Sequence, residues 1–158
     1  MTKTKKCWYI AGLNFGCSQC GACCSGPEEG CIWTTRREIE LIAEYLKTTI
    51  SDVRKKYLRR FGFRTSIIEH PVTKDCIFLR MENGAKRCQI YPVRPNQCRT
   101  WPFWSSNLES VNTWNQAAQK CGGINRGRYY SFEEIEKIRK SKNWQANESA
   151  GKTNSKSR

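Results

Sequence analysis

The chain has 158 residues, ten of them cysteine, and a formal net charge of +14. This length favours one domain that buries roughly two-thirds of its unfolded surface, around a modest core because only 38% of residues are apolar. No stretch approaches the roughly 20 apolar residues of a membrane span, so we expect no transmembrane helix. The positive charge favours an acidic partner, namely nucleic acid, anionic lipid or an acidic protein.

The density of cysteine has two interpretations, a secreted disulfide scaffold or a reduced protein with metal-bound thiolates. The apolar stretch at residues 7–13 is too short for a signal-peptide core and is interrupted by Gly12. We therefore expect a cytoplasmic protein in a reducing compartment.

Capping patterns predict the helices of the first half. The Thr35-to-Glu38 segment is a capping box and predicts a helix through about Lys47. Ser51 and Asp52 predict a second helix that continues to Phe61, presents a basic outer face and ends at Gly62.

Short strands are predicted over residues 65–69, 76–81 and 86–91, with an Asn83-Gly84 turn joining the last two. A two-residue loop places Cys88 opposite Leu79, whereas a three-residue loop places it on the side of Cys76. In a regular hairpin the two thiols lie too far apart for one metal ion, so either they serve different sites or Cys76 lies on a bend before the strand.

Three prolines shape the next stretch, in which Pro95 starts a helical turn that presents Cys98 and Pro102 ends it. Further helices are predicted over residues 108–120 and after Ser131, where a second capping box begins. The expected fold is a small α+β single domain, with short helices and a β-hairpin organised around a cysteine-ligated metal site. Its expected limits are a lead-in at 1–14, the domain at 15–140 and a disordered basic tail at 141–158.

The cysteine spacing predicts the metal chemistry. A C-x2-C-x2-C run suits an iron–sulfur cluster, with 4Fe-4S favoured, whereas structural zinc combines one cysteine pair with a remote pair. Because the side chains of the adjacent Cys23 and Cys24 are expected to point apart, we infer two neighbouring metal centres. The candidate ligands are Cys17, Cys20, Cys23, Cys24, Cys76, Cys88, Cys98 and Cys121.

Residues around this set have weaker assignments. Arg94 and Arg99 flank Cys98 and are candidates to contact a bound cofactor or its thiolates. His70, the one histidine, is expected to be structural or exposed. Cys7 and Cys31 lie outside the cysteine pattern, and both a spare thiol and a ligand remain open for each.

The cysteines and their neighbours resemble a known family. The segments that carry the resemblance are Phe15, the Cys17-to-Cys24 run, Cys76-x-Phe78-Leu79, Cys88-x-Ile90-Tyr91, Arg94-Pro95-x-x-Cys98-Arg99 and Cys121-Gly122. Together they are similar to the YkgJ-type CxxCxxCC cysteine-cluster family. The resemblance spans about residues 15–123 and implies a zinc- or iron-chelating domain. Flagellin lysine N-methylases contain a related cluster, which raises an enzymatic alternative.

Three functions follow from these patterns. The first is an iron–sulfur protein for electron transfer, redox sensing or cluster handling, with an unknown protein partner. The second is a zinc-stabilised basic module that binds nucleic acid or an acidic protein. The third is an enzyme, either an iron–sulfur oxidoreductase or an activity related to the methylases, and for this we find no methyl-donor site.

Overall fold

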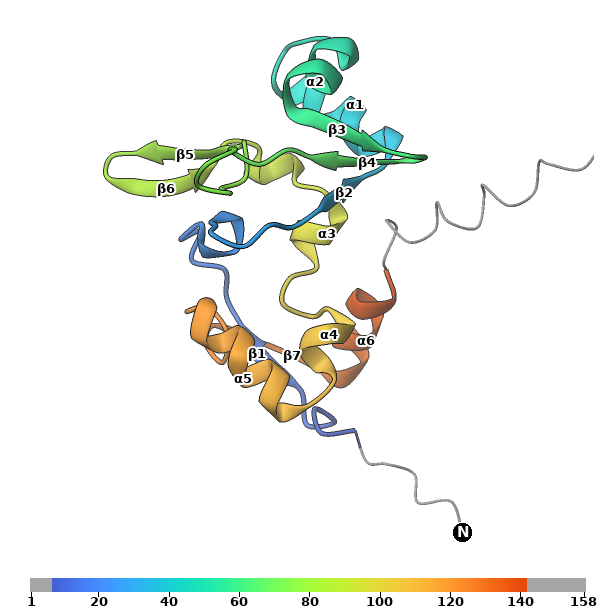
Figure 1. Ribbon diagram of the computed structural model, residues 1–158. Coiled ribbons are helices and arrows are strands. Elements are labelled where there is room, and N and C mark those ends of the chain that lie inside the picture. The colour runs from blue at the N-terminus through green and yellow to red at the C-terminus, as the bar shows by residue number, and fades with distance from the viewer. Residues whose placement is uncertain (1–6, 142–158) are drawn as a thin grey trace, which may run out of the picture. The chain divides into compact units, whose positions relative to one another are not determined.

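The computed structural model describes residues 7–141, and the predicted basic tail lies outside them apart from Ser141. The fold is α+β, as predicted, and the chain forms two compact units (Figure 1). Unit 1 combines the residues up to Ser18 with Thr100–Ser141, and unit 2 comprises Gln19–Arg99. The expectation of one domain over 15–140 stays a prediction.

Unit 1 joins the two ends of the described chain. Strand β1 (Leu13–Phe15), which crosses the boundary between the predicted lead-in and the predicted domain, pairs antiparallel with β7 (Arg128–Tyr130). Its helices are α4 (Ser105–Leu108), α5 (Val111–Lys120) and α6 (Phe132–Lys140). The Ser131 capping box is confirmed, whereas α5 starts later than predicted because a capping box at Ser110 opens it.

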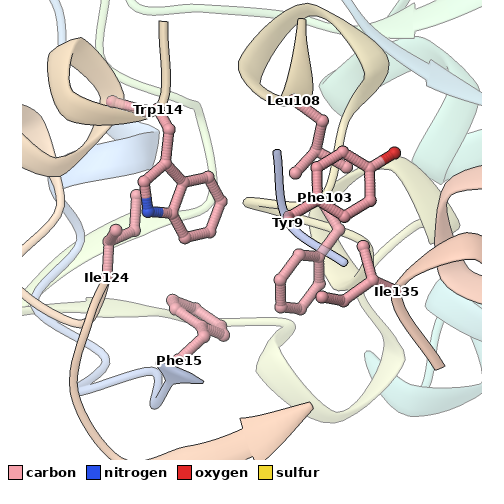
Figure 2. Packing of buried hydrophobic residues seen from close by; sticks show 8 residues of the cluster. Tyr9, Phe15, Phe103, Leu108, Trp114, Ile124 and Ile135 are labelled. Carbon is pink, nitrogen blue, oxygen red and sulfur yellow. The ribbon is translucent and has the colours of Figure 1, made fainter. Parts of the chain in front are cut away.

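Aromatic side chains form the core of unit 1 (Figure 2). Phe103 stacks on Trp114 with ring centroids 6.0 Å apart, and Phe15 meets Phe103 edge to face at the same distance. The indole Nε1 of Trp114 donates to Asn125 Oδ1 at 2.9 Å, which satisfies the polar atom of a buried ring. Ile135 of α6 is also fully buried in this core.

Unit 2 contains two small sheets and an aliphatic core. Strands β2 (Ile32–Thr34), β4 (Arg64–Ile67) and β3 (Leu58–Phe61) form one sheet in that order, and β5 (Leu79–Glu82) pairs with β6 (Ala85–Cys88). The helical elements are η1 (Ala22–Cys24), α1 (Arg36–Tyr45), α2 (Ile50–Tyr57), η2 (Tyr91–Val93) and α3 (Asn96–Arg99). The core gathers Ile39, Ile42, Val53, Ile67, Phe78 and Ile90.

The first helix confirms its predicted start. The Thr35 side chain accepts from the Glu38 amide while a Glu38 oxygen accepts from the Thr35 amide at 2.8 Å. The other Glu38 oxygen accepts from the Asn96 amide at 2.7 Å, so the same carboxylate ties α1 to α3. The predicted helical turn after Pro95 is α3 and is also confirmed.

The predicted second helix is wrong at both ends. Its cap is Thr49 rather than Ser51, and the helix ends at Tyr57, where the chain becomes strand β3. Leu58 pairs with Ile67 of β4 and faces the core, a tertiary contact that outweighs local helical preference. Gly62, expected to end the helix, instead occupies the turn between β3 and β4 with a left-handed φ of 58°.

The predicted Asn83-Gly84 hairpin is confirmed with a two-residue loop, since Glu82 pairs with Ala85 and Leu79 with Cys88. The first of these strands begins later than predicted, at Leu79. Cys76 lies before it, in a bridge to Glu69 and in a turn closed by the Leu79 amide bonding the Cys76 carbonyl at 2.9 Å. Cys76 therefore lies on a bend, one of the two alternatives left by the sequence.

Candidate metal centre

The loop that carries Cys20, Cys23 and Cys24 is held against the β5–β6 hairpin and the segment before it. The Cys76 amide donates to the Cys24 carbonyl at 2.7 Å, and the Gly26 amide donates to Asp75 Oδ1 at 2.8 Å. These bonds place the second half of the cysteine loop beside Cys76, although the two segments are about fifty residues apart in sequence.

Two basic side chains of β6 extend this attachment. Lys86 Nζ donates to Ser25 Oγ at 2.8 Å, and Arg87 Nη1 donates to the Gln19 carbonyl at 3.2 Å. Gly21 has a left-handed φ of 72°, and a Cβ atom there would lie 2.9 Å from side-chain carbons of Leu79 and Lys86. Only glycine fits both the backbone conformation and the narrow space.

The sulfur atoms of Cys23 and Cys24 lie 3.8 Å apart. The expectation that these neighbouring side chains point apart is therefore wrong. Both residues belong to the 3-10 turn η1 rather than to a strand. Successive side chains of a helical turn project at a smaller angle than those of a strand, so their sulfur atoms can meet.

The two adjacent thiols have opposite pKa shifts. The hydrogen bond from the Cys24 thiol, with the charge of Arg94 as a smaller contribution, lowers the pKa of Cys23 to about 7. The same hydrogen bond and burial raise the pKa of Cys24. One member of the pair is thus stabilised as a thiolate by the proton on the other, which is the charge state a metal ligand needs.

Cys76 and Cys98 lie close enough to the pair to interact with it electrostatically, and Cys88 lies close enough to interact with Cys76 and Cys98. Burial raises the pKa of Cys76 to about 11, and repulsion from Cys88 and Cys23 adds to the rise. Burial likewise raises the pKa of Cys98, with contributions from Cys76, Cys23 and Cys88. Mutual repulsion among thiolates in one place is relieved when a cation binds between them.

The arginines beside Cys98 differ in their surroundings. The charge of Arg94 contributes to the lowered pKa of Cys23 and partly opposes the raised pKa of Cys98, and its guanidinium lies 3.7 Å from the centre of the Tyr91 ring. Its Nε also donates to the Tyr91 carbonyl at 3.0 Å, which holds the side chain in place. Arg99 is exposed on α3, and its predicted role beside a cofactor stays a prediction.

The eight predicted ligands are divided between the two units. Cys20 is exposed in unit 2, whereas Cys17 and Cys121 belong to unit 1. Within unit 1 the Gly16 amide bonds the Gly123 carbonyl at 3.0 Å, so the segments that carry Cys17 and Cys121 run side by side. Six of the predicted ligands therefore lie in unit 2, and the other two lie on adjacent segments of unit 1.

The residues outside the predicted set have other environments. Cys7 packs against the aromatic core of unit 1, and the Cys31 carbonyl accepts from Gln97 Nε2 at 2.9 Å. His70 Nδ1 accepts from the amides of Val72 and Thr73 at 3.3 Å, which closes a turn and agrees with a structural role.

Among residues 7–141, no three His, Cys, Asp or Glu side chains converge closely enough to form a ready metal site. The donor chemistry nevertheless fits zinc or iron, because soft thiolates are the ligands these metals take in tetrahedral sites. A bound ion would supply the charge that holds the sulfurs of unit 2 together. No helix among the same residues is long and apolar enough to cross a membrane.

The family comparison agrees with this donor set. The profile of the CxxCxxCC family, described as a "putative zinc- or iron-chelating domain", matches residues 16–122. The chain belongs to this family. The predicted resemblance is therefore confirmed, and the CxxCxxCC assignment supports a metal-binding protein that chelates zinc or iron.

One relative of this CxxCxxCC protein is the uncharacterized protein MJ0661 of Methanocaldococcus jannaschii, 38% identical over 96 residues. The matched region is 60% of this chain and 48% of that protein, so the chain spans about half the length of this relative. No solved structure matches the chain.

Sequence reasoning missed several residues that hold the cysteine loop, namely Gly21, Ser25, Asp75 and Lys86. Their contacts join segments far apart in the chain, and none of these residues has a distinctive spacing from the cysteines. The glycine directly after Cys20 was the one available signal, since a glycine beside a ligand often marks a left-handed turn.

Proposed function

We propose that this protein is a zinc-stabilised binding module in which unit 2 holds one metal ion on four thiolates. The ligands are drawn from Cys23, Cys24, Cys76, Cys88 and Cys98. The observation that carries the proposal is the 3.8 Å distance between the Cys23 and Cys24 sulfurs. Around a tetrahedral ion with metal–sulfur bonds of about 2.3 Å, two ligand sulfurs are separated by about 3.8 Å.

An iron–sulfur cluster is the second candidate. The C-x2-C-x2-C spacing in the sequence favours it. Such a centre would serve electron transfer, redox sensing or cluster handling. In the favoured 4Fe-4S cluster each cysteine binds a different iron, which requires sulfurs farther apart than those of Cys23 and Cys24.

The ion proposed for unit 2 has a structural role. Zinc has no redox chemistry, so its contribution is to hold the loop, the bend at Cys76 and the turn at Cys98 together. Arg94 offsets part of the thiolate charge at Cys23 and Cys98. Lys86 and Arg87 hold the loop on β6 by hydrogen bonds.

Metal and acid-labile sulfide analysis of anaerobically purified protein tests the proposal. We expect a colourless protein with zinc, at about one ion per chain in unit 2, and no labile sulfide. A brown protein containing iron and labile sulfide would contradict the zinc proposal and favour the iron–sulfur cluster. Protein free of both metals after purification without chelators would reject both.

Single serine variants test the ligand set. Cys24→Ser and Cys98→Ser should each weaken zinc binding at least about 100-fold, because each removes a proposed ligand. Cys31→Ser is the matched control, since Cys31 is half-buried in the same unit and lies outside the proposed set. Equal zinc affinity in all three variants would place the metal elsewhere.

A further inference from the structure

One face of the β2–β4–β3 sheet carries alternating aromatic and basic side chains. The pairings Phe61 with Arg64, Arg59 with Ser66 and Trp33 with Ser66 place these five residues on the same face. The opposite face is turned to the core by Ile32, Leu58 and Ile67.

The side chains on this face stack on one another. The Arg64 guanidinium lies 3.7 Å from the centre of the Trp33 ring, and the Arg59 guanidinium lies 4.6 Å from that of Phe61. Trp33 and Phe61 meet edge to face at 5.8 Å. Cation–π contacts hold the guanidinium groups over the rings, so the face is a preformed platform.

The tip and edge of the platform are exposed. Phe63, in the two-residue turn between β3 and β4, is 87% exposed, a large fraction for an aromatic side chain, and Phe61 is also exposed. Arg59 and Arg60 of β3 are exposed as well.

The charge around the platform has one sign. Between Val53 and Ile68 the chain has six basic residues and no acidic one. The nearby Glu29 carboxylate already pairs with Lys74 at 2.7 Å, and its pKa is lowered mainly by that lysine and only slightly by Arg59. The platform therefore favours an anionic partner.

We propose that this face, the basic–aromatic platform of Trp33, Arg59, Phe61, Phe63 and Arg64, binds single-stranded nucleic acid. Unpaired bases stack on aromatic rings and on guanidinium planes, while the phosphates between them need cations at short intervals. The platform supplies rings for the bases and cations for the phosphates along the β3–β4 strand pair. The basic residues of α2, Arg54, Lys55 and Lys56, extend the positive surface and are exposed.

Other anionic partners match fewer of these features. Duplex nucleic acid keeps its bases stacked inside, so exposed rings gain little from it. An acidic peptide would use the charge but would gain less from the aromatic rings. An anionic membrane would use Phe63 as an inserted side chain, but the other aromatic residues lie along the strands rather than at the tip.

The test is fluorescence anisotropy with the full chain, purified without chelators. The probes are fluorescein-labelled oligouridylate and oligothymidylate of about 12 nucleotides, within the usual site size of such surfaces. A duplex of equal length and phosphatidylserine-containing vesicles provide the alternative partners. We expect the single strands to bind more tightly than the duplex, with affinity falling steeply from about 50 to about 200 mM salt.

Matched variants separate stacking from general charge. Phe63→Ser should weaken binding about tenfold, whereas Val72→Ser, at another residue exposed by 82%, should leave it unchanged. Arg59→Gln should reduce the salt slope by about 0.7, the value for one lost phosphate contact, more than Arg36→Gln on α1 does. Thermal melting of each variant checks that the fold is retained.

Three results would overturn the proposal. They are absence of binding to both single strands at low salt, equal affinities for Phe63→Ser and Val72→Ser, and binding to vesicles without binding to oligonucleotides. The proposal does not depend on the identity of the metal, because none of the platform residues is a proposed ligand. A protein with an iron–sulfur cluster could therefore still pass this test.

Discussion

The two units bury different kinds of side chain. Unit 1 has a core rich in rings, in which Tyr9, Phe15, Phe103 and Trp114 pack together (Figure 2). Unit 2 has mainly aliphatic residues in its core, and the half-buried Cys76 and Cys88 pack against them. Large aromatic side chains bury much apolar area each, so unit 1 has a hydrophobic source of stability that unit 2 shares to a smaller extent.

The difference implies that the units respond differently to loss of metal. In unit 2 the loop with Cys23 and Cys24 has few apolar side chains and is attached by hydrogen bonds to β6 and to the bend at Cys76. Such a loop gains order from a bound ion. We therefore expect metal to determine the stability of unit 2 more than that of unit 1.

Chelation should have the largest effect. Because a structural zinc site contributes on the order of 10 kcal/mol, removing the ion should unfold much of unit 2 and leave the core of unit 1 protected. Hydrogen exchange resolved by peptide, with and without chelator, measures this. Equal loss of protection in peptides containing Phe78 and Trp114 would show that both units depend on metal.

Truncating a buried side chain in either core should have the next largest effect on stability. Trp114→Ala removes a buried ring and its hydrogen bond to Asn125, and should cost about 3–5 kcal/mol in unit 1. Ile42→Ala, at a fully buried position of unit 2, should cost about 2–5 kcal/mol. Urea unfolding of the metal-loaded protein gives both values. In chelated protein only the Trp114 substitution should still lower the free energy of unfolding.

Two of the capping boxes, one in each unit, permit a closer comparison with smaller expected changes in stability. Thr35→Ala in unit 2 and Ser131→Ala in unit 1 each remove the acceptor at a helix start, at a cost of about 1 kcal/mol. Thermal unfolding with and without metal measures each loss. If chelation leaves the Thr35→Ala effect intact, the fold of unit 2 does not require the ion.

The smallest expected effect is a pH dependence in unit 1. Arg139, bonded to Glu136 at 2.7 Å, and then the Tyr9 hydroxyl hold the pKa of Glu136 at about 2, below its ordinary 4.5. Because the folded-state pKa is depressed, this stabilisation is full above the ordinary pKa and is lost as pH falls towards about 2.

Glu136→Gln removes this dependence. The variant should be less stable than the parent at neutral pH by about 1 kcal/mol, the scale of a partly exposed ion pair, and the gap should narrow on acidification. Urea midpoints at neutral pH and at about pH 3 measure the gap. If the difference in stability between variant and parent is the same at both pH values, the effect of the variant arises from packing rather than from charge.

The local signals in the sequence were sufficient for several elements. The Thr35 and Ser131 capping boxes, the Pro95 turn and the Asn83-Gly84 hairpin each depend on residues within a few positions of one another, and each is confirmed. The cysteine spacing likewise led to the correct family, because ligand residues are recognised by type and order.

Contacts between distant segments decided the rest. A helix that continued to Phe61 agreed with the local sequence pattern. Pairing with β4 instead made Leu58–Phe61 a strand and so placed Arg59 and Phe61 on the platform. The sequence alone determined that thiols for a metal were present. Only the tertiary structure decided that Cys23 and Cys24 meet beside Cys76, because hydrogen bonds with Asp75, Cys76 and Lys86 hold that loop, and no spacing along the chain encodes them.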